Sequence, residues 1–210
     1  MSTAPEPSVP AVAPSTALAD VRFRQAKYVI KRPWISFFNR TFRVYGEDGA
    51  LVLFVQHPIF KLRGEWQIFA DEAKSESLVR VKAQQVIALN FMYDLTDLRT
   101  GDIIGSVRTK GLRSIVRDTI EILNPAGEVI GHLIEKGASI LRRFFPWLTS
   151  KHDIEVGGEI VATVRQKFRF FIKEFHVDQT QVVFGDDLDP RLILTCALLA
   201  VVNESQRESS

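Results

Sequence analysis

A basic ladder is the first pattern in this chain whose residue types and spacing suggest chemistry. The expected strand Val164–Lys173 has a cation at every second position from Arg165, the three being Arg165, Lys167 and Arg169. Side chains alternate between the faces of a strand, so these cations share one face and Phe168 and Phe170 take the other. A ladder on the outside of a sheet suits phosphate headgroups, since each cation near an anionic membrane contributes on the order of 1 kcal/mol. The alternative is an ordinary solvated face.

The segment Lys136–Lys151, in which large aromatic residues lie next to arginines, is a second candidate. Its apolar members include Phe144, Phe145, Trp147 and Leu148, and its cations include Arg142 and Arg143. In an insertion loop, apolar rings enter the lipid interface while cations hold headgroups. Alternatively, the segment packs across one end of the fold and its aromatic rings cover the core.

A third basic group follows one of the predicted hairpins. It consists of Arg108, Lys110, Arg113 and Arg117. This group either joins the same surface or forms a solvated connection. Together with Lys31 and Arg32, the three groups form our hypothesis for lipid contact, although the sequence does not place them side by side.

Patterns typical of catalysis are missing from the sequence. The four histidines are scattered and lack the spacing of a metal site: His57, His132, His152 and His176. The glycines occur at turns, whereas phosphate-cradling loops join a strand to a helix. The single cysteine, Cys196, lies in an apolar segment, so we expect a small core residue and not a nucleophile. We therefore predict a protein that is not an enzyme and has no cofactor.

The composition predicts one folded domain without a nucleic-acid partner. The 210 residues have a net charge of only +2, and no recognition helix or aromatic RNA-binding motif is evident. Residues 1–20, rich in Pro, Ala and Ser, predict a disordered leader without signal-peptide features, and residues 205–210 predict a disordered polar tail. The domain then spans 21–204. A lone cysteine fits a reducing compartment, so we expect a cytoplasmic protein, with or without membrane contact.

One helix is the most distinctive element that must position these residues. Leu192–Val202 is apolar on every side except at Thr195. Such a helix is buried in a core or in a membrane. At about 1.5 Å per residue it reaches only about half the length of a membrane span. Asp189 is a suitable N-cap and Pro190 suits the first helical position. We predict a core helix enclosed by a β-sheet.

Repeated hairpins make up most of the remaining sequence. Four segments each contain two β-like runs around a turn: Thr41–Val55, Phe91–Val107, Thr119–Ile134 and Lys151–Phe168. The last three share a Gly-[Asp/Glu]-x-[Ile/Val]-[Gly/Ala] motif that begins at Gly101, Gly127 and Gly158, and such glycines supply positive φ at turns. Gly105 and Gly131 in the return strands indicate bends or bulges.

Further strands are predicted between and beyond these hairpins. They are Lys27–Ile30, Trp66–Ala70, Leu78–Val81, Phe170–Val177 and Thr180–Phe184. About a dozen short, regularly spaced strands favour a mainly β fold, an antiparallel sheet closed into a barrel. A barrel of this size needs a filling, and the apolar helix is suited to provide it.

The order of these features resembles the tubby-like superfamily. The resemblance rests on the repeated hairpins, the strand Gly64–Phe69 (GEWQIF), the acidic loop Phe184–Asp189 and the final apolar helix. The nearest likeness is to the LURP-one-related and phospholipid-scramblase-like branch. The resemblance covers nearly all of 21–204 and implies a closed barrel of about twelve antiparallel strands around a central C-terminal helix. It also implies binding of phosphoinositides at a membrane surface.

The scramblase likeness also raises the question of calcium. Matching the two patterns puts the calcium segment proposed for scramblases at His176–Asp187, with Asp178 and Asp187 at ligand positions. Gln181 then replaces the turn glycine that a twelve-residue calcium loop needs. Helix capping explains Asp187 and Asp189 more simply. Asp178 and Asp187 are therefore weak calcium candidates, and no metal site is predicted.

Three functions remain open from the sequence. The preferred one is a non-catalytic module that binds anionic phospholipid headgroups through an exterior basic surface. The second is scramblase-like lipid translocation, which requires Leu192–Val202 to enter the bilayer. The third is a structural or interaction domain without a lipid role, in which a small apolar ligand could lie beside the helix.

Overall fold

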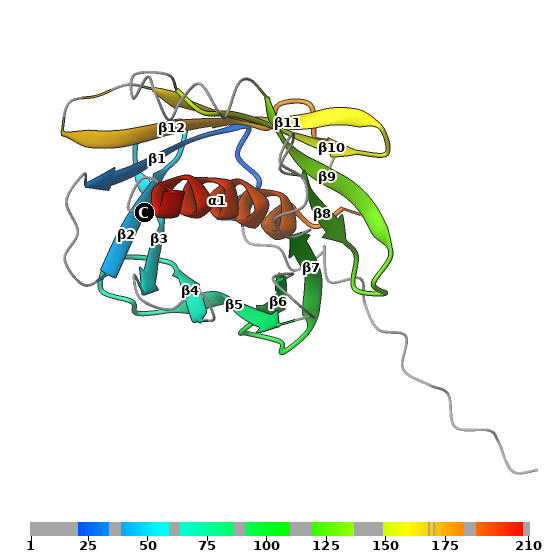
Figure 1. The fold of residues 1–210 in the computed structure, drawn as a ribbon. Helices are drawn as coiled ribbons and strands as arrows, with labels where there is room; N and C mark the ends of the chain where they lie inside the picture. The colour runs from blue at the N-terminus through cyan, green and yellow to red at the C-terminus, as the bar shows by residue number, and fades with distance from the viewer. Residues whose placement is uncertain are drawn as a thin grey trace, which may run out of the picture.

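The computed structural model describes residues 21–33, 39–58, 64–85, 91–109, 119–136, 149–167, 169, 171–182 and 188–207 (Figure 1). The described elements are one short 3-10 helix, twelve strands and one α-helix. They are η2 (Val21–Phe23), β1 (Lys27–Pro33), β2 (Asn39–Tyr45), β3 (Leu51–Pro58), β4 (Glu65–Phe69), β5 (Ser77–Gln85), β6 (Phe91–Asp97), β7 (Ile103–Thr109), β8 (Thr119–Leu123), β9 (Val129–Lys136), β10 (Lys151–Val156), β11 (Glu159–Lys167), β12 (Ile172–Asp178) and α1 (Pro190–Arg207).

The twelve strands form one closed antiparallel barrel. Each strand pairs with its neighbours in sequence, and β1 pairs with β12 to close the sheet. The four predicted hairpins are confirmed as β2–β3, β6–β7, β8–β9 and β10–β11. The turn glycines Gly101, Gly127 and Gly158 have φ values of 83°, 83° and 88°, as the shared motif predicted.

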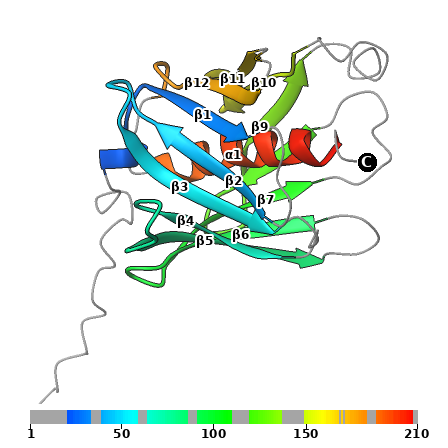
Figure 2. The ribbon, with the colours of Figure 1, turned by 90° about the vertical axis from the view of Figure 1, so that its left-hand side faces the viewer.

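The barrel is filled by α1, which crosses its interior (Figures 1 and 2). Every residue of the apolar stretch Leu192–Val202 is buried, so the predicted core helix is confirmed. The Asp189 Oδ1 accepts a hydrogen bond of 2.9 Å from the Arg191 amide, which is N-cap geometry, and Pro190 is the first helical residue. No helix in the described part of the chain combines the length and apolar composition that crossing a bilayer requires.

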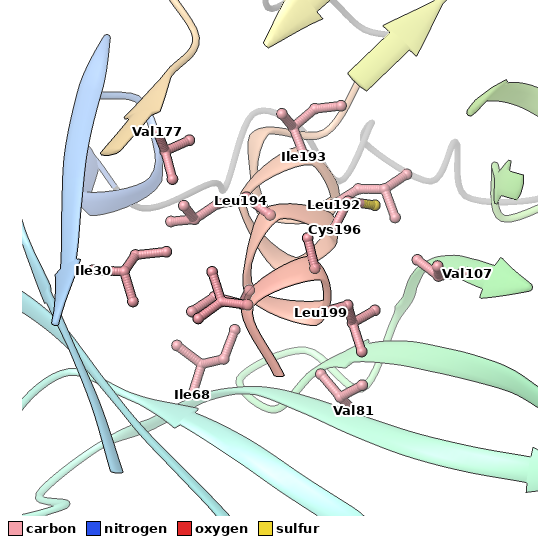
Figure 3. Close-up of a cluster of buried hydrophobic side chains, with 14 of the residues drawn as sticks. Ile30, Ile68, Val81, Val107, Val177, Leu192, Ile193, Leu194, Cys196 and Leu199 are labelled. Carbon is pink, nitrogen blue, oxygen red and sulfur yellow. The ribbon is translucent and has the colours of Figure 1, made fainter. Parts of the chain in front are cut away.

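The inward-pointing residues of the strands form the rest of the core around α1. Inward-pointing residues such as Ile30, Ile68, Val81, Val107 and Val177 surround α1 on several sides (Figure 3). A sheet with one face on a core and one face in solvent produces this pattern. Cys196 is fully buried among these side chains, as predicted, and burial raises the pKa of its thiol.

The two glycines inside return strands lie beside bulges, as predicted, and also allow close approaches. At Gly105, φ is 151° and an added Cβ would lie 2.6 Å from the carbonyl oxygen of Leu123 and 3.1 Å from the Leu192 side chain on α1. At Gly131 an added Cβ would lie 2.2 Å from the carbonyl oxygen of Glu155. The strand register shifts beside both positions. The bulges let the sheet bend around the helix.

Two strand predictions are wrong in part. The predicted strand Val164–Lys173 is divided, because β11 ends at Lys167 and β12 begins at Ile172. The beginning of the predicted strand Thr180–Phe184 is a turn, because Asp178 Oδ1 accepts hydrogen bonds from the Thr180 amide (3.0 Å) and hydroxyl (2.7 Å). The remainder of that segment, 183–187, lies outside the described residues.

Because the strands alternate in direction, the barrel has two distinct ends. At one, named the Asp97 end, β6 and the other even-numbered strands stop and α1 begins. At the other, named the Arg32 end, β1 and the other odd-numbered strands stop and the last turns of α1 lie. In Figure 1 the C-terminal end of α1 (red) lies near the arrowhead of β1 (blue).

Candidate functional site

The exterior basic ladder is shorter than the sequence predicts, and one of its cations is paired with a carboxylate. Arg165 and Lys167 lie on the outward face of β11, as expected. However, the Arg165 Nη2 lies 2.7 Å from Asp153 Oδ1 on β10, and Nη1 donates to the His152 carbonyl (3.1 Å). Arg169 follows the end of β11, so the ladder has only two members on the strand.

Arg108 does not join this ladder. It lies on β7, and β8, β9 and β10 separate β7 from β11 around the barrel wall. Its Nη2 lies 2.6 Å from Glu121 Oε2 on β8. A cation paired with a carboxylate on the next strand stabilises the sheet and offers little charge to a membrane.

Several predicted site residues lie outside the described residues. These are Lys110, Arg113, Arg142, Arg143, Phe144, Phe145, Trp147, Leu148 and Asp187. Their role stays a prediction. The strands that flank the two basic segments are described, however: β7 and β9 end, and β8 and β10 begin, at the Arg32 end.

The β11–β12 connection exposes an aromatic residue that the sequence reasoning missed. The side chain of Phe171 is 85% exposed, and Ile172 beside it is also exposed. Lys167 and Arg169, both exposed, precede it at the same end of the barrel. Arg169 Nε lies 3.8 Å from Glu174 Oε2. The signal was in the sequence: of the three phenylalanines Phe168, Phe170 and Phe171, only Phe171 is an even number of residues from Arg165 and Lys167.

Inside the barrel, polar side chains gather near the Arg32 end. They point inward from the wall and form what we name the inner polar ring: Arg32, Arg40, His57, Glu135, His152 and Lys173. Five of them are buried, and Lys173 is half-buried. Arg32 was expected on the exterior as part of a lipid-contact group. That expectation is wrong, because its position on β1 shares the inward face with Tyr28 and Ile30.

Three members of this ring are cations from adjacent strands. Arg32 on β1 and Lys173 on β12 are direct cross-strand partners, and Arg40 lies on β2 at the other side of β1. Burial and the nearby Arg40 lower the pKa of Arg32 to about 10. Burial, opposed by Glu204 of α1 and reinforced by Arg32 and Arg40, lowers the pKa of Lys173 to about 8.

At the Asp97 end a buried cation is surrounded by carboxylates. Arg191 on α1 is 1% exposed and donates to Asp97 at the end of β6 and to Asp189, with 2.9 Å between Nε and Asp189 Oδ1. Burial alone would lower the pKa of Arg191, but these two carboxylates raise it above its ordinary value. The group therefore holds the start of α1 to the wall and is structural.

The weak calcium candidate and the histidines do not form a metal cluster in the described part of the chain. Asp178, a weak calcium candidate, uses its carboxylate to hold Thr180, and these hydrogen bonds lower its pKa. The four histidines lie on four different strands, and His176 Nε2 is 2.7 Å from Glu174 Oε1. Within the described ranges, no group of three or more His, Cys, Asp or Glu side chains could hold a metal ion.

Comparisons with known proteins add no further assignment. No family model matches the chain, and neither a curated protein nor a solved structure matches it. The fold and the geometry described above therefore carry the functional argument.

Proposed function

We propose that this protein is a non-catalytic module that docks on anionic phospholipid membranes with the Arg32 end of its barrel. The carrying observation is Phe171, which is 85% exposed and lies beside the exposed cations Lys167 and Arg169. An exposed ring next to cations is the combination that suits a lipid interface, where the ring enters and the cations meet headgroups.

The expected interaction is weak and reversible. Burial of one phenylalanine side chain contributes about 2 kcal/mol, and each cation near an anionic surface contributes about 1 kcal/mol. The second contribution is screened by salt. The pairing of Arg165 with Asp153 and of Arg108 with Glu121 favours docking through the barrel end over docking through the outer wall.

We also propose that the chain belongs to the tubby-like superfamily, in the LURP-one-related and phospholipid-scramblase-like branch. The closed twelve-stranded antiparallel barrel and its single C-terminal helix support this assignment. Surface binding is preferred over scramblase-like translocation because Leu192–Val202, the segment that would enter the bilayer, is buried inside the barrel. A cytoplasmic location stays part of the proposal.

Vesicle co-sedimentation tests the docking. We expect binding to phosphatidylcholine vesicles only when phosphatidylserine is added, and a loss of binding as salt increases. Phe171→Ser and Lys167→Gln should each weaken it. The matched controls lie at the Asp97 end: Ile103→Ser removes an exposed apolar side chain and Lys27→Gln removes an exposed lysine. Equal binding by all four variants would contradict docking through the Arg32 end, and no binding by the wild type would favour an interaction domain without a lipid role.

A further inference from the structure

Large apolar side chains that are exposed gather at the two ends of the barrel. In the described part of the chain they are Val21, Ile103, Val129 and Ile160 at the Asp97 end and Phe171 and Ile172 at the Arg32 end. Exposed apolar side chains that gather in one place among polar residues mark interaction surfaces. Both ends of the barrel are therefore candidates for contact with a partner.

At the Asp97 end, the exposed apolar residues come mainly from the repeated hairpin motif. After each turn glycine the motif has an acidic residue and then an apolar one, and all of these side chains are exposed: Asp102, Ile103, Glu128, Val129, Glu159 and Ile160. The three hairpins β6–β7, β8–β9 and β10–β11 follow one another around the barrel. In Figure 1 the turns of the last two lie on the same side as the start of α1 (orange). We name these six residues the acidic hairpin surface.

The negative charge of this surface is not cancelled by the turns themselves. Arg99, a cation in the β6–β7 turn, lies 3.6 Å from the carboxylate of Asp97. Among the described residues, the exposed carboxylates of Asp102 and Glu159 take part in no ion pair. The acidic hairpin surface thus combines apolar side chains with uncompensated negative charge.

The exposed residues around the β11–β12 connection have the same two components with the opposite charge. We name Lys167, Arg169, Phe171 and Ile172 the Phe171 surface; all four side chains are exposed. One carboxylate, that of Glu174, lies 3.8 Å from Arg169 Nε, so two cations and one carboxylate leave the surface positive. The strand β11 joins the two surfaces, because it begins with Glu159 at the Asp97 end and ends with Lys167 at the Arg32 end.

We propose that this protein self-associates head to tail, with the acidic hairpin surface of one copy on the Phe171 surface of the next. Opposite charges steer such a contact and fix its orientation, and the apolar side chains of both surfaces leave water together. A contact between two copies of the same end would bring like charges together and is disfavoured. Because each surface has few apolar residues, the association is weak and reversible.

This self-association does not depend on membrane docking, although both use the Phe171 surface. A copy that is docked on a membrane has only its acidic hairpin surface available, and a second copy can bind there. In solution, each copy has both surfaces available. A head-to-tail contact leaves one surface of each kind unused in a pair, so it extends into chains or rings.

Sedimentation velocity of the whole protein without lipid tests the proposal. We expect the average mass to rise with protein concentration past that of a dimer, and to fall as salt is added, because salt screens the opposite charges. A wild type that stays monomeric at every concentration would overturn the proposal, and the acidic hairpin surface would then need a different, basic partner.

Two charge reversals each disable one surface. Glu159→Lys alters the acidic hairpin surface and Lys167→Glu alters the Phe171 surface, and each should weaken self-association at least about tenfold. A mixture of the two variants keeps one intact surface of each kind. It should therefore form a heterodimer that does not grow further. Wild-type association by either variant alone, or a mixture that associates no better than its components, would overturn the head-to-tail contact.

The matched controls make the same substitutions at the opposite ends. Glu65→Lys replaces an exposed residue that begins β4 at the Arg32 end, and Lys27→Glu replaces an exposed residue that begins β1 at the Asp97 end. Each has the same net charge as its partner variant. We expect both controls to associate at least as strongly as the wild type. A loss as large as that of the reversals would attribute the effect to net charge and overturn the proposal.

Vesicle binding separates this contact from membrane docking. Glu159→Lys should lose self-association and still bind vesicles that contain phosphatidylserine, because its Phe171 surface is intact. Loss of both by this variant would show that its effect is not confined to the Asp97 end, and would overturn the assignment of the acidic hairpin surface. Self-association is measured without lipid, so failure of either proposal leaves the other measurable.

Discussion

The buried cations at the two ends of the barrel have different neighbours. At the Asp97 end, one cation, Arg191, lies between two carboxylates. Phe23 of η2 is fully buried there, and Gln179 donates to the carbonyls of Phe23 and Gln25. At the Arg32 end, cations lie next to cations. The difference shows that the Asp97 end joins α1 to the wall by pairing its buried cation with carboxylates, whereas the Arg32 end brings cations from adjacent strands to the inner face of the sheet.

The largest expected effect is at Arg191. Arg191→Met leaves Asp97 and Asp189 buried without their cation, so we expect the free energy of unfolding to fall by about 3–5 kcal/mol. Urea denaturation measures it. The control is Arg22→Met at the same end, whose half-exposed pair with Glu76 (3.5 Å) contributes less than about 1 kcal/mol. Equal losses for the two variants would show that the Asp97 end is not held by its buried charges.

A smaller loss is expected at Gln179. Gln179→Ala removes the donor to the Phe23 and Gln25 carbonyls (3.2 and 2.8 Å) inside a buried region. We expect a loss of about 2 kcal/mol in the free energy of unfolding. Gln181→Ala, in the exposed turn two residues later, should change it by less than about 0.5 kcal/mol. If the free energies of unfolding of the two variants differ by less than about 0.5 kcal/mol, η2 does not close this end.

Lys173→Met should stabilise the protein, in contrast to the two substitutions above. It removes a charge that burial and two arginines disfavour, so near neutral pH we expect the free energy of unfolding to rise by about 1 kcal/mol, a value reduced for solvent screening. The pKa of Lys173 is about 8 in the folded protein and 10.5 ordinarily. Below pH 8 the Lys173 ammonium is protonated in both the folded and the unfolded state, so burial of its charge destabilises the folded state fully. Between pH 8 and pH 10.5 only the unfolded state keeps this proton, so the free energy of unfolding of the wild type rises with pH.

The advantage of Lys173→Met over the wild type should therefore shrink as the pH is raised from 7 toward 10.5. Urea denaturation of both proteins across this range measures the change. Lys31→Met, which removes a lysine from the outward face of the same strand pair, is the matched control. If the stability difference between Lys173→Met and the wild type does not change with pH, the Lys173 ammonium is not the cause of that difference.

The smallest stability effect is expected at Phe171. Because its ring is already in solvent, Phe171→Ser should change the free energy of unfolding by less than about 0.5 kcal/mol, while it weakens vesicle binding several-fold. The contrast between denaturation and co-sedimentation sharpens the assignment of the Arg32 end. A large loss of stability would place Phe171 with the structural residues instead.

Local sequence signals were sufficient for the fold. The Asp189–Pro190 cap, the apolar stretch Leu192–Val202 and the turn glycines each act over a few residues, and together they predicted a barrel around a helix. The Arg191–Asp97 contact joins residues 94 positions apart, so no local pattern could reveal it. The inner polar ring was missed for a different reason: strand alternation puts Arg32 on the inner face, but its charge alone suggested the outside.

The pairing of β1 with β12 has a consequence for how the chain folds. β1 and β12 must pair before the sheet is closed, and α1, which follows all the described strands in the sequence, must be available to fill the barrel. Contacts between such distant segments form slowly, because a long loop has to close before they stabilise anything. Until then the apolar inner faces of the early hairpins and two strand edges are exposed, so the chain is most prone to aggregation before α1 is in place.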